Sequence, residues 1–101
     1  MQQNLKRLGG EALMIYEQEV EALLKNDREL HLVAGLASEA GEVCAVFQKS
    51  SYKGLPIDLN NLKEELGDVL FYTTALANKY GFSLDELMHS NIEKLTQRHK
   101  K

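Results

Sequence analysis

The sequence predicts an all-α fold, an antiparallel bundle of about four helices in one domain that covers residues 1–101. Only one proline, Pro56, interrupts a chain rich in the strong helix formers Leu, Ala, Glu and Lys. Apolar residues recur at spacings of three and four in four segments, which is typical of helices that bury one face. A chain of 101 residues lies in the size range of a single compact domain.

The first helix is expected from about Gly10 to Lys25. Its apolar positions are Leu13, Tyr16, Val20, Leu23 and Leu24. Asn26 and Asp27 follow, and either side chain can accept hydrogen bonds from the free N–H groups at the start of the next helix. These residues therefore predict a break between two helices.

The second helix, from about Glu29 to Ser50, is expected to bury one apolar stripe. The stripe consists of Val33, Leu36, Ala37, Ala40, Val43, Cys44 and Phe47. Residues 50–58 contain Ser, Gly, Pro and Asp, which predicts an exposed loop over a site. The next helix should be capped at Asp58 or Asn60.

The third helix should run to Tyr80 and end at Gly81, which can adopt a left-handed conformation. Its core stripe is Leu62, Leu66, Val69, Thr73, Leu76, Ala77 and Tyr80. Leu70, Phe71 and Ala75 lie off this stripe, so the helix is apolar around most of its circumference, as expected when two sides are buried. We therefore expect a homodimer or homotetramer in which another copy covers the second side.

The fourth helix begins with a capping-box pattern at Ser83 and Glu86 and should extend to about His99. Its apolar positions are Leu84, Leu87, Met88, Ile92 and Leu95. The basic tail from Arg98 to Lys101 lies where cations favour a helix C-terminus.

Composition excludes several classes of partner. The formal net charge of −3 argues against a nucleic-acid partner, because proteins that bind polyanions are usually basic. Cys44 is the only cysteine, so no internal disulfide can form, and we expect a small core residue in a reducing, cytoplasmic protein. No run approaches the ~20 apolar residues that span a bilayer, and no signal peptide is recognisable, so no membrane partner is expected.

Two of the expected helices carry an acidic pair with a spacing of three. Glu39 pairs with Glu42, and Glu65 pairs with Asp68, so each pair occupies one helix face. The first pair precedes the expected loop by about eight residues and the second follows it by about seven, roughly 10–12 Å along each helix. If the two helices pack antiparallel, the four carboxylates converge at one height.

Carboxylates that converge repel one another, and a bound cation would offset this repulsion. Two unit charges about 4 Å apart repel by roughly 4 kcal/mol at an effective dielectric of about 20. Oxygen-only ligands suit Mg²⁺, with Mn²⁺ as a substitute, better than zinc. A single acidic pair is common on a solvated helix, but two pairs at matched heights favour a metal site. Gly41 and Gly67 lie inside the motifs, and each costs about 1 kcal/mol in a helix interior, which close packing or ligand approach would explain.

Basic and amide side chains that can meet phosphate oxygens lie in two places. Lys49 lies on the same side of its helix as the acidic pair, and Lys53 is expected in the loop. On the fourth helix Asn91, Lys94 and Arg98 form one polar row, and arginine can bind phosphate through two hydrogen bonds. Each of these side chains is also compatible with a solvated surface.

The acidic motifs resemble those of the MazG-like family of all-α nucleotide pyrophosphohydrolases. The family signature is ExxE, a spacer and ExxD, which here reads EAGE, 22 residues and ELGD. The flanking LASEAGEV and EELGDVLFY, with NIEKL and Arg98 near the end, extend the similarity from about Leu30 onward.

The resemblance implies a helical, oligomeric enzyme that hydrolyses a nucleoside triphosphate to the monophosphate and pyrophosphate. It assigns Mg²⁺ to the four acidic residues, with Glu39 as the expected general base that orients a metal-bound water. It also implies substrate or supporting contacts from Lys53, Asn91, Lys94 and Arg98. Candidates for a base pocket, each equally compatible with core or surface, are Tyr16, His31, Phe47 and Tyr72.

Three alternatives remain open at this point. A phosphoribosyl-ATP pyrophosphohydrolase shares the superfamily fold and the acidic motifs. A ferritin-like di-iron protein needs ExxH on two helices, whereas only Glu86 with His89 fits that pattern. A non-catalytic helical module would bind nucleotides or a protein partner without cleavage, and the complete acidic motifs argue against it.

Overall fold

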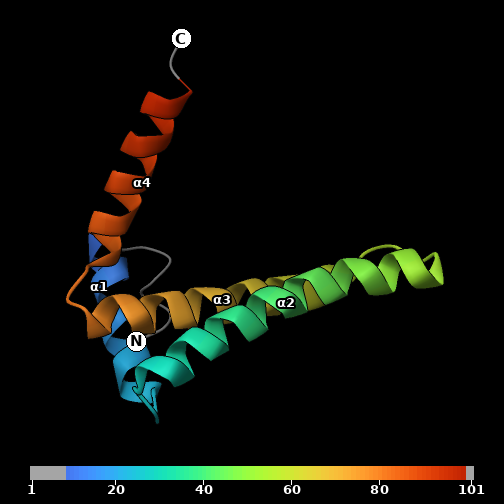
Figure 1. Ribbon diagram of the computed structural model, residues 1–101, viewed down its shortest axis with the longest axis horizontal. Helices are drawn as coiled ribbons and strands as arrows, with labels where there is room; N and C mark the ends of the chain where they lie inside the picture. Colours follow the sequence, from blue (N-terminus) through green and yellow to red (C-terminus); the bar gives the residue numbers. More distant parts are fainter. Residues whose placement is uncertain (1–8, 100–101) are drawn as a thin grey trace.

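A computed structural model describes residues 9–99 of the chain, and this part contains four helices and no strand. The helices are α1 (Gly9–Leu23), α2 (Glu29–Lys53), α3 (Leu59–Lys79) and α4 (Leu84–Arg98). The prediction of an all-α fold with four helices is confirmed (Figure 1).

The helices α2 and α3 form a long antiparallel hairpin (Figure 1). Gly54 ends α2 in the left-handed conformation, with φ 64°, and its N–H donates to the carbonyl of Ser50. The carboxylate of Asp58 accepts a hydrogen bond from the N–H of Asn61, so of the two predicted caps, Asp58 and Asn60, Asp58 is the N-cap. The loop is shorter than expected, because α2 continues past Ser50. Lys53 is therefore the last residue of a helix and not part of the loop.

The start of α2 differs from the expectation. Asn26 does accept a hydrogen bond through Oδ1, but from the N–H of Arg28 at 3.0 Å. Arg28 is the N-cap residue of α2, and its side chain accepts no hydrogen bond from the N–H groups of the first helical turn. The polar break was therefore located correctly, while the predicted capping of the helix by Asn26 or Asp27 is wrong.

A small core lies where α1 crosses the hairpin. Val20, Leu32 and Ala75 are fully buried there, one from each of the first three helices. Partly buried side chains surround them: Tyr16, Leu24, Phe71, Tyr72 and Leu76. This core joins α1 to the end of the hairpin away from the α2–α3 loop (Figure 1).

This packing requires a glycine at position 35, because the ring of Tyr72 occupies the space that a Cβ would need. A Cβ at position 35 would overlap the ring atoms, closer than real Cβ contacts occur. We expect Gly35→Ala to lower the free energy of unfolding by about 1–3 kcal/mol, since overpacking outweighs the gain in helix propensity. Urea unfolding would measure this. Gly41→Ala is the matched control, because nothing lies near its Cβ. That variant should be at least as stable as the wild type, and an equally stable Gly35→Ala would refute the packing argument.

The last helix leaves the hairpin instead of lying along it. Gly81, with φ 75°, turns the chain as predicted, and the capping box of Ser83 and Glu86 is confirmed. The carboxylate of Glu17 accepts a 2.6 Å hydrogen bond from the N–H of Leu84, which ties the start of α4 to α1. From there α4 points away from α2 and α3 (Figure 1).

The predicted core stripe of α2 is for the most part at the surface. Val33 and Phe47 expose 52% and 46% of their area, and Cys44 is exposed, so its prediction as a core residue is wrong. The side of α2 that faces α3 instead buries Leu32 and Val46. The reason is that α2 has two apolar sides and this chain supplies a neighbour for only one.

Among residues 9–99, α2 is the one helix long and apolar enough to cross a membrane by length and composition. This is weak evidence, since a helix of a soluble protein passes the same test. The helix also carries Glu39 and Glu42 midway along its length, which is costly in a bilayer.

Candidate metal centre

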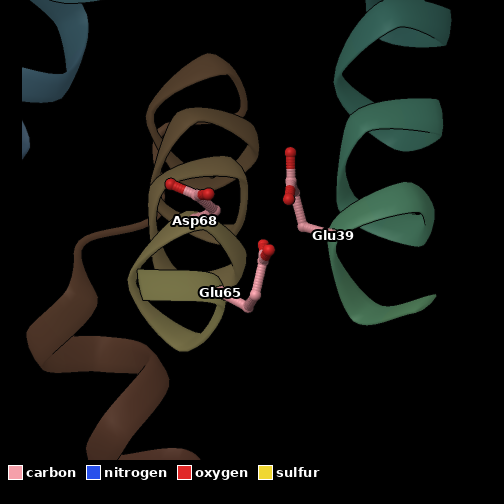
Figure 2. A group of neighbouring side chains, drawn as sticks. All are labelled: Glu39, Glu65 and Asp68. Atoms are coloured by element: carbon pink, nitrogen blue, oxygen red, sulfur yellow. The ribbon is translucent and has the colours of Figure 1, made fainter. Parts of the chain in front are cut away.

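Three of the four predicted acidic side chains converge between α2 and α3 (Figure 2). Glu39 comes from α2, while Glu65 and Asp68 come from α3. One carboxylate oxygen of each lies within 4.8 Å of the other two. Glu39 and Glu65 are partly buried, and Asp68 is exposed. The antiparallel hairpin therefore brings the two motifs to one height, as their spacing predicted.

The convergence is electrostatically strained in the absence of a cation. Burial raises the pKa of Glu65, and a hydrogen bond with Glu39 and the charges of Glu39, Glu42 and Asp68 raise this pKa further. The protonated form of Glu65 can donate to the carboxylate of Glu39, which is how neighbouring carboxyl groups relieve repulsion without a metal.

Glu42 lies outside this group of three, although its charge still reaches Glu65. It is exposed, on the flank of α2 one turn after Glu39. We call the group of Glu39, Glu65 and Asp68 the acidic cluster, and Glu42 lies at its edge.

Tyr16, on α1, is influenced electrostatically by the cluster. Burial raises the pKa of Tyr16, and the charge of Asp68 raises this pKa further. Of the four candidates for a base pocket, Tyr16 is the one whose pKa responds to the charge of a cluster residue.

The other base-pocket candidates lie elsewhere. Tyr72 packs its ring on Gly35 and makes edge contacts with His31 and Phe71, at centroid distances of 6.0 and 5.4 Å. His31 is exposed beside it. Phe47 belongs to the exposed apolar stripe of α2 described above.

The two lysines of α2 lie toward the loop end of the hairpin. Lys49 and Lys53 are exposed and line a shallow cleft of about 300 Å³ together with Asp58 and Asn61. Lys49 is ten residues after Glu39, roughly 15 Å along the helix. The structure thus places both lysines beside the hairpin tip rather than in the acidic cluster.

The predicted polar row of α4 is also separate from the cluster. Asn91 and Lys94 line a groove of about 800 Å³ between α1, α3 and α4, and most of the other lining side chains are apolar. Arg98 is the last residue of α4, at the end that points away from the hairpin (Figure 1). Within residues 9–99 no lysine or arginine forms an ion pair with a carboxylate, and the one contact of this kind joins the imidazole of His89 to Asp85, outside the cluster.

The donor set fits a hard divalent cation. All the converging atoms are carboxylate oxygens, with no His or Cys among them. Mg²⁺ binds through few carboxylates and keeps positions for water and phosphate oxygens. After burial, the hydrogen bond with Glu39 and the charges of Glu39, Glu42 and Asp68 raise the pKa of Glu65, and a dication held by these carboxylates would offset their repulsion.

Comparison with known proteins gives one match. The family model described as the MazG nucleotide pyrophosphohydrolase domain matches residues 27–101, which include α2, α3, α4 and both acidic motifs. No curated protein and no solved structure matches the chain.

Proposed function

Because this chain belongs to the MazG nucleotide pyrophosphohydrolase domain family, we propose that it is a Mg²⁺-dependent nucleoside triphosphate pyrophosphohydrolase. The reaction converts an NTP or dNTP and water to the nucleoside monophosphate and pyrophosphate. The observation that carries the proposal is the convergence of Glu39, Glu65 and Asp68 within 4.8 Å, without a neutralising lysine or arginine in the described chain.

In this proposal the three carboxylates of the cluster hold the metal, and Glu42 completes the set after a change of its side-chain rotamer. A bound Mg²⁺ screens phosphate charge and lowers the pKa of a bound water. Glu39, the one member of the cluster on α2, is proposed as the base that orients the water toward phosphorus. Lys49 and Lys53 border the path along which a triphosphate would extend toward the hairpin tip.

The proposed enzyme is a homodimer or a homotetramer. The chain exposes 8026 Å², whereas a compact monomer of 11.4 kDa exposes about 5,800 Å². Even if the ten residues outside 9–99 contributed the full area of an unfolded chain, an excess of about 1,000 Å² would remain. A standard interface buries about 800 Å² per partner, so the excess is enough for one.

The exposed apolar area is consistent with such an interface. Large apolar side chains of α2, α3 and α4 are about half exposed or more, among them Val33, Phe47, Leu66, Leu70 and Ile92. A patch of this kind on a soluble protein marks an interaction surface. We further propose a cytoplasmic protein with neither nucleic acid nor membrane as a partner.

The test is pyrophosphate release from a panel of NTPs and dNTPs, with Mg²⁺, with Mn²⁺ and with EDTA. We expect metal-dependent formation of one monophosphate and one pyrophosphate per substrate. Phosphoribosyl-ATP is included as a competing substrate, and its faster turnover would assign the chain to that branch of the superfamily. A protein that binds nucleotides tightly and releases no pyrophosphate with any substrate would be the non-catalytic module instead.

A further inference from the structure

A residue of α1 holds the turn between α3 and α4 from both sides. The backbone carbonyl of Glu17 accepts a hydrogen bond from Nδ2 of Asn78 at 3.0 Å, and its carboxylate accepts one from the N–H of Leu84 at 2.6 Å. Asn78 belongs to the last turn of α3, and Leu84 is the first residue of α4. The chain reverses between them at Gly81, with φ 75°. Glu17 therefore connects the end of one helix to the start of the next.

The contact with Glu17 is the one hydrogen bond that ties α4 to another helix within residues 9–99. The capping box of Ser83 and Glu86 is local and forms whichever way α4 points. Leu84, buried at the same place, adds an apolar anchor. Farther along α4, Met88 and Ile92 expose 52% and 64% of their area. The direction in which α4 leaves the hairpin therefore depends mainly on its first turn (Figure 1).

Glu17 is itself fixed relative to the hairpin by the packing of α1. Val20, one turn later on α1, is 1% exposed and lies in the core with Leu32 of α2 and Ala75 of α3. Tyr16, next to Glu17 in the chain, packs against the same core. A carboxylate at a helix N-terminus is also favoured by the helix dipole. The hydrogen bond from Glu17 thus links the start of α4 to the helices that carry the acidic cluster.

A small change in direction at this end of α4 is amplified along the helix. Arg98 is 14 residues after Leu84, about 21 Å at the helical rise. A rotation of about 10° at the first turn would move Arg98 by roughly 4 Å, which is more than a hydrogen bond tolerates. Asn91 and Lys94, the other predicted phosphate contacts of α4, would move by about 2–3 Å. The position of these side chains therefore depends on the contact at Leu84.

We propose that Glu17 is a positioning residue for nucleotide binding: through its hydrogen bond to Leu84 it sets the direction of α4, and with it the position of Lys94 and Arg98. This inference rests on the proposed function, because the phosphate contacts of α4 are themselves predictions. It does not depend on which copy of the chain holds the triphosphate. It assigns a role to α1, a helix that precedes residues 27–101, the part that the family model matches.

Two substitutions of Glu17 test this role by steady-state kinetics. Glu17→Ala removes the acceptor, whereas Glu17→Gln keeps an amide oxygen that can accept from the same N–H. We expect Glu17→Ala to raise KM for the preferred nucleoside triphosphate by about 5–10-fold and to keep kcat within about twofold, because binding weakens while the metal centre is intact. Glu17→Gln should keep KM within about twofold of the wild type. Glu21→Ala, at an exposed position one turn later on α1, is the matched control and should change neither constant.

The division between KM and kcat separates positioning from stability. Partial unfolding would lower the apparent kcat and leave KM of the remaining folded enzyme unchanged. In a variant that already carries Lys94→Ala and Arg98→Ala, Glu17→Ala should raise KM no further, because it acts through these side chains. An unchanged KM in Glu17→Ala, an equal rise in Glu17→Gln or Glu21→Ala, or an undiminished further rise in that background would overturn the proposal. If the wild type releases no pyrophosphate from any nucleotide, the proposed function is wrong instead.

The direction of α4 can also be measured without reference to activity. In a Cys44→Ser background, spin labels attached at Lys63→Cys on α3 and Gln97→Cys on α4, both exposed positions, report the distance between the two helices. Dilution with unlabelled protein leaves only distances within one chain. Glu17→Ala should shift or broaden the distance distribution by about 4 Å, and Glu17→Gln should reproduce that of the wild type. A distribution that Glu17→Ala leaves unchanged would overturn the proposal, whatever the activity.

Discussion

Asp68→Asn is expected to lower kcat/KM for the preferred nucleotide by at least about 100-fold, because a lost metal ligand removes both charge and geometry at the reacting phosphate. The substitution keeps the size of the side chain and removes its charge, and Asp68 is exposed, so the helical fold should persist. Glu39→Gln should lose a comparable factor, since it removes the carboxylate proposed as base. Steady-state pyrophosphate release measures both effects, and circular dichroism checks the fold.

Asp27→Asn is the matched control for this prediction. Asp27 is exposed in the connection between α1 and α2 and lies outside the acidic cluster. The same chemical change there should leave kcat/KM within about twofold, as surface substitutions usually do. Equal activity of Asp68→Asn and Asp27→Asn would contradict the assignment of the cluster as the catalytic metal centre.

Mg²⁺ is expected to stabilise the protein strongly. A ligand that binds only the folded state at a hundred times its Kd adds about 2.7 kcal/mol to the free energy of unfolding. For a chain of this size that corresponds to a rise in Tm of roughly 10 °C or more. Differential scanning calorimetry with Mg²⁺ and with EDTA measures it. Mn²⁺ and Ca²⁺ are useful comparisons, because carboxylate oxygens suit these cations as well.

The metal-free protein should lose stability as the pH rises. Burial and the neighbouring carboxylates raise the pKa of Glu65 above its ordinary value of 4.5. Between 4.5 and the raised pKa the folded state therefore binds more protons than the unfolded state, and the free energy of unfolding falls with increasing pH. At a pH above the raised pKa the free energy of unfolding falls no further on account of Glu65, and bound Mg²⁺ should restore the stability that was lost. In EDTA, Glu65→Gln should flatten this part of the pH profile. In a separate measurement with Mg²⁺, the same substitution should abolish the rise in Tm that Mg²⁺ produces in the wild type. A wild-type protein whose stability increases with pH through the same window would contradict the strained cluster.

The local structure followed from the sequence because its determinants are local. The cap at Asp58, the capping box at Ser83 and Glu86 and the left-handed Gly81 were all predicted and confirmed. Each depends on hydrogen bonds or backbone freedom within a few residues. The spacing of the acidic motifs around one turn likewise sufficed to predict that carboxylates of α2 and α3 would meet.

The sequence did not reveal which apolar side of a helix is buried. Periodicity identified Val33, Cys44 and Phe47 as the core stripe of α2, whereas Leu32 and Val46 occupy that place. Both sides of α2 are apolar, so their difference in burial energy is too small for a pattern to rank. The choice depends on which side α3, α1 or a second copy can fill.

By itself, then, the sequence determined an all-α chain of four helices and a meeting of acidic pairs across a hairpin, because helix periodicity and turn chemistry are encoded at short range. Only the tertiary structure decided that Glu42 stays at the edge of the cluster, that the charge of Asp68 reaches Tyr16, and that α4 leaves the hairpin. Those features depend on how surfaces far apart in the chain compete for contact with one another, and residue spacing carries no information about that competition.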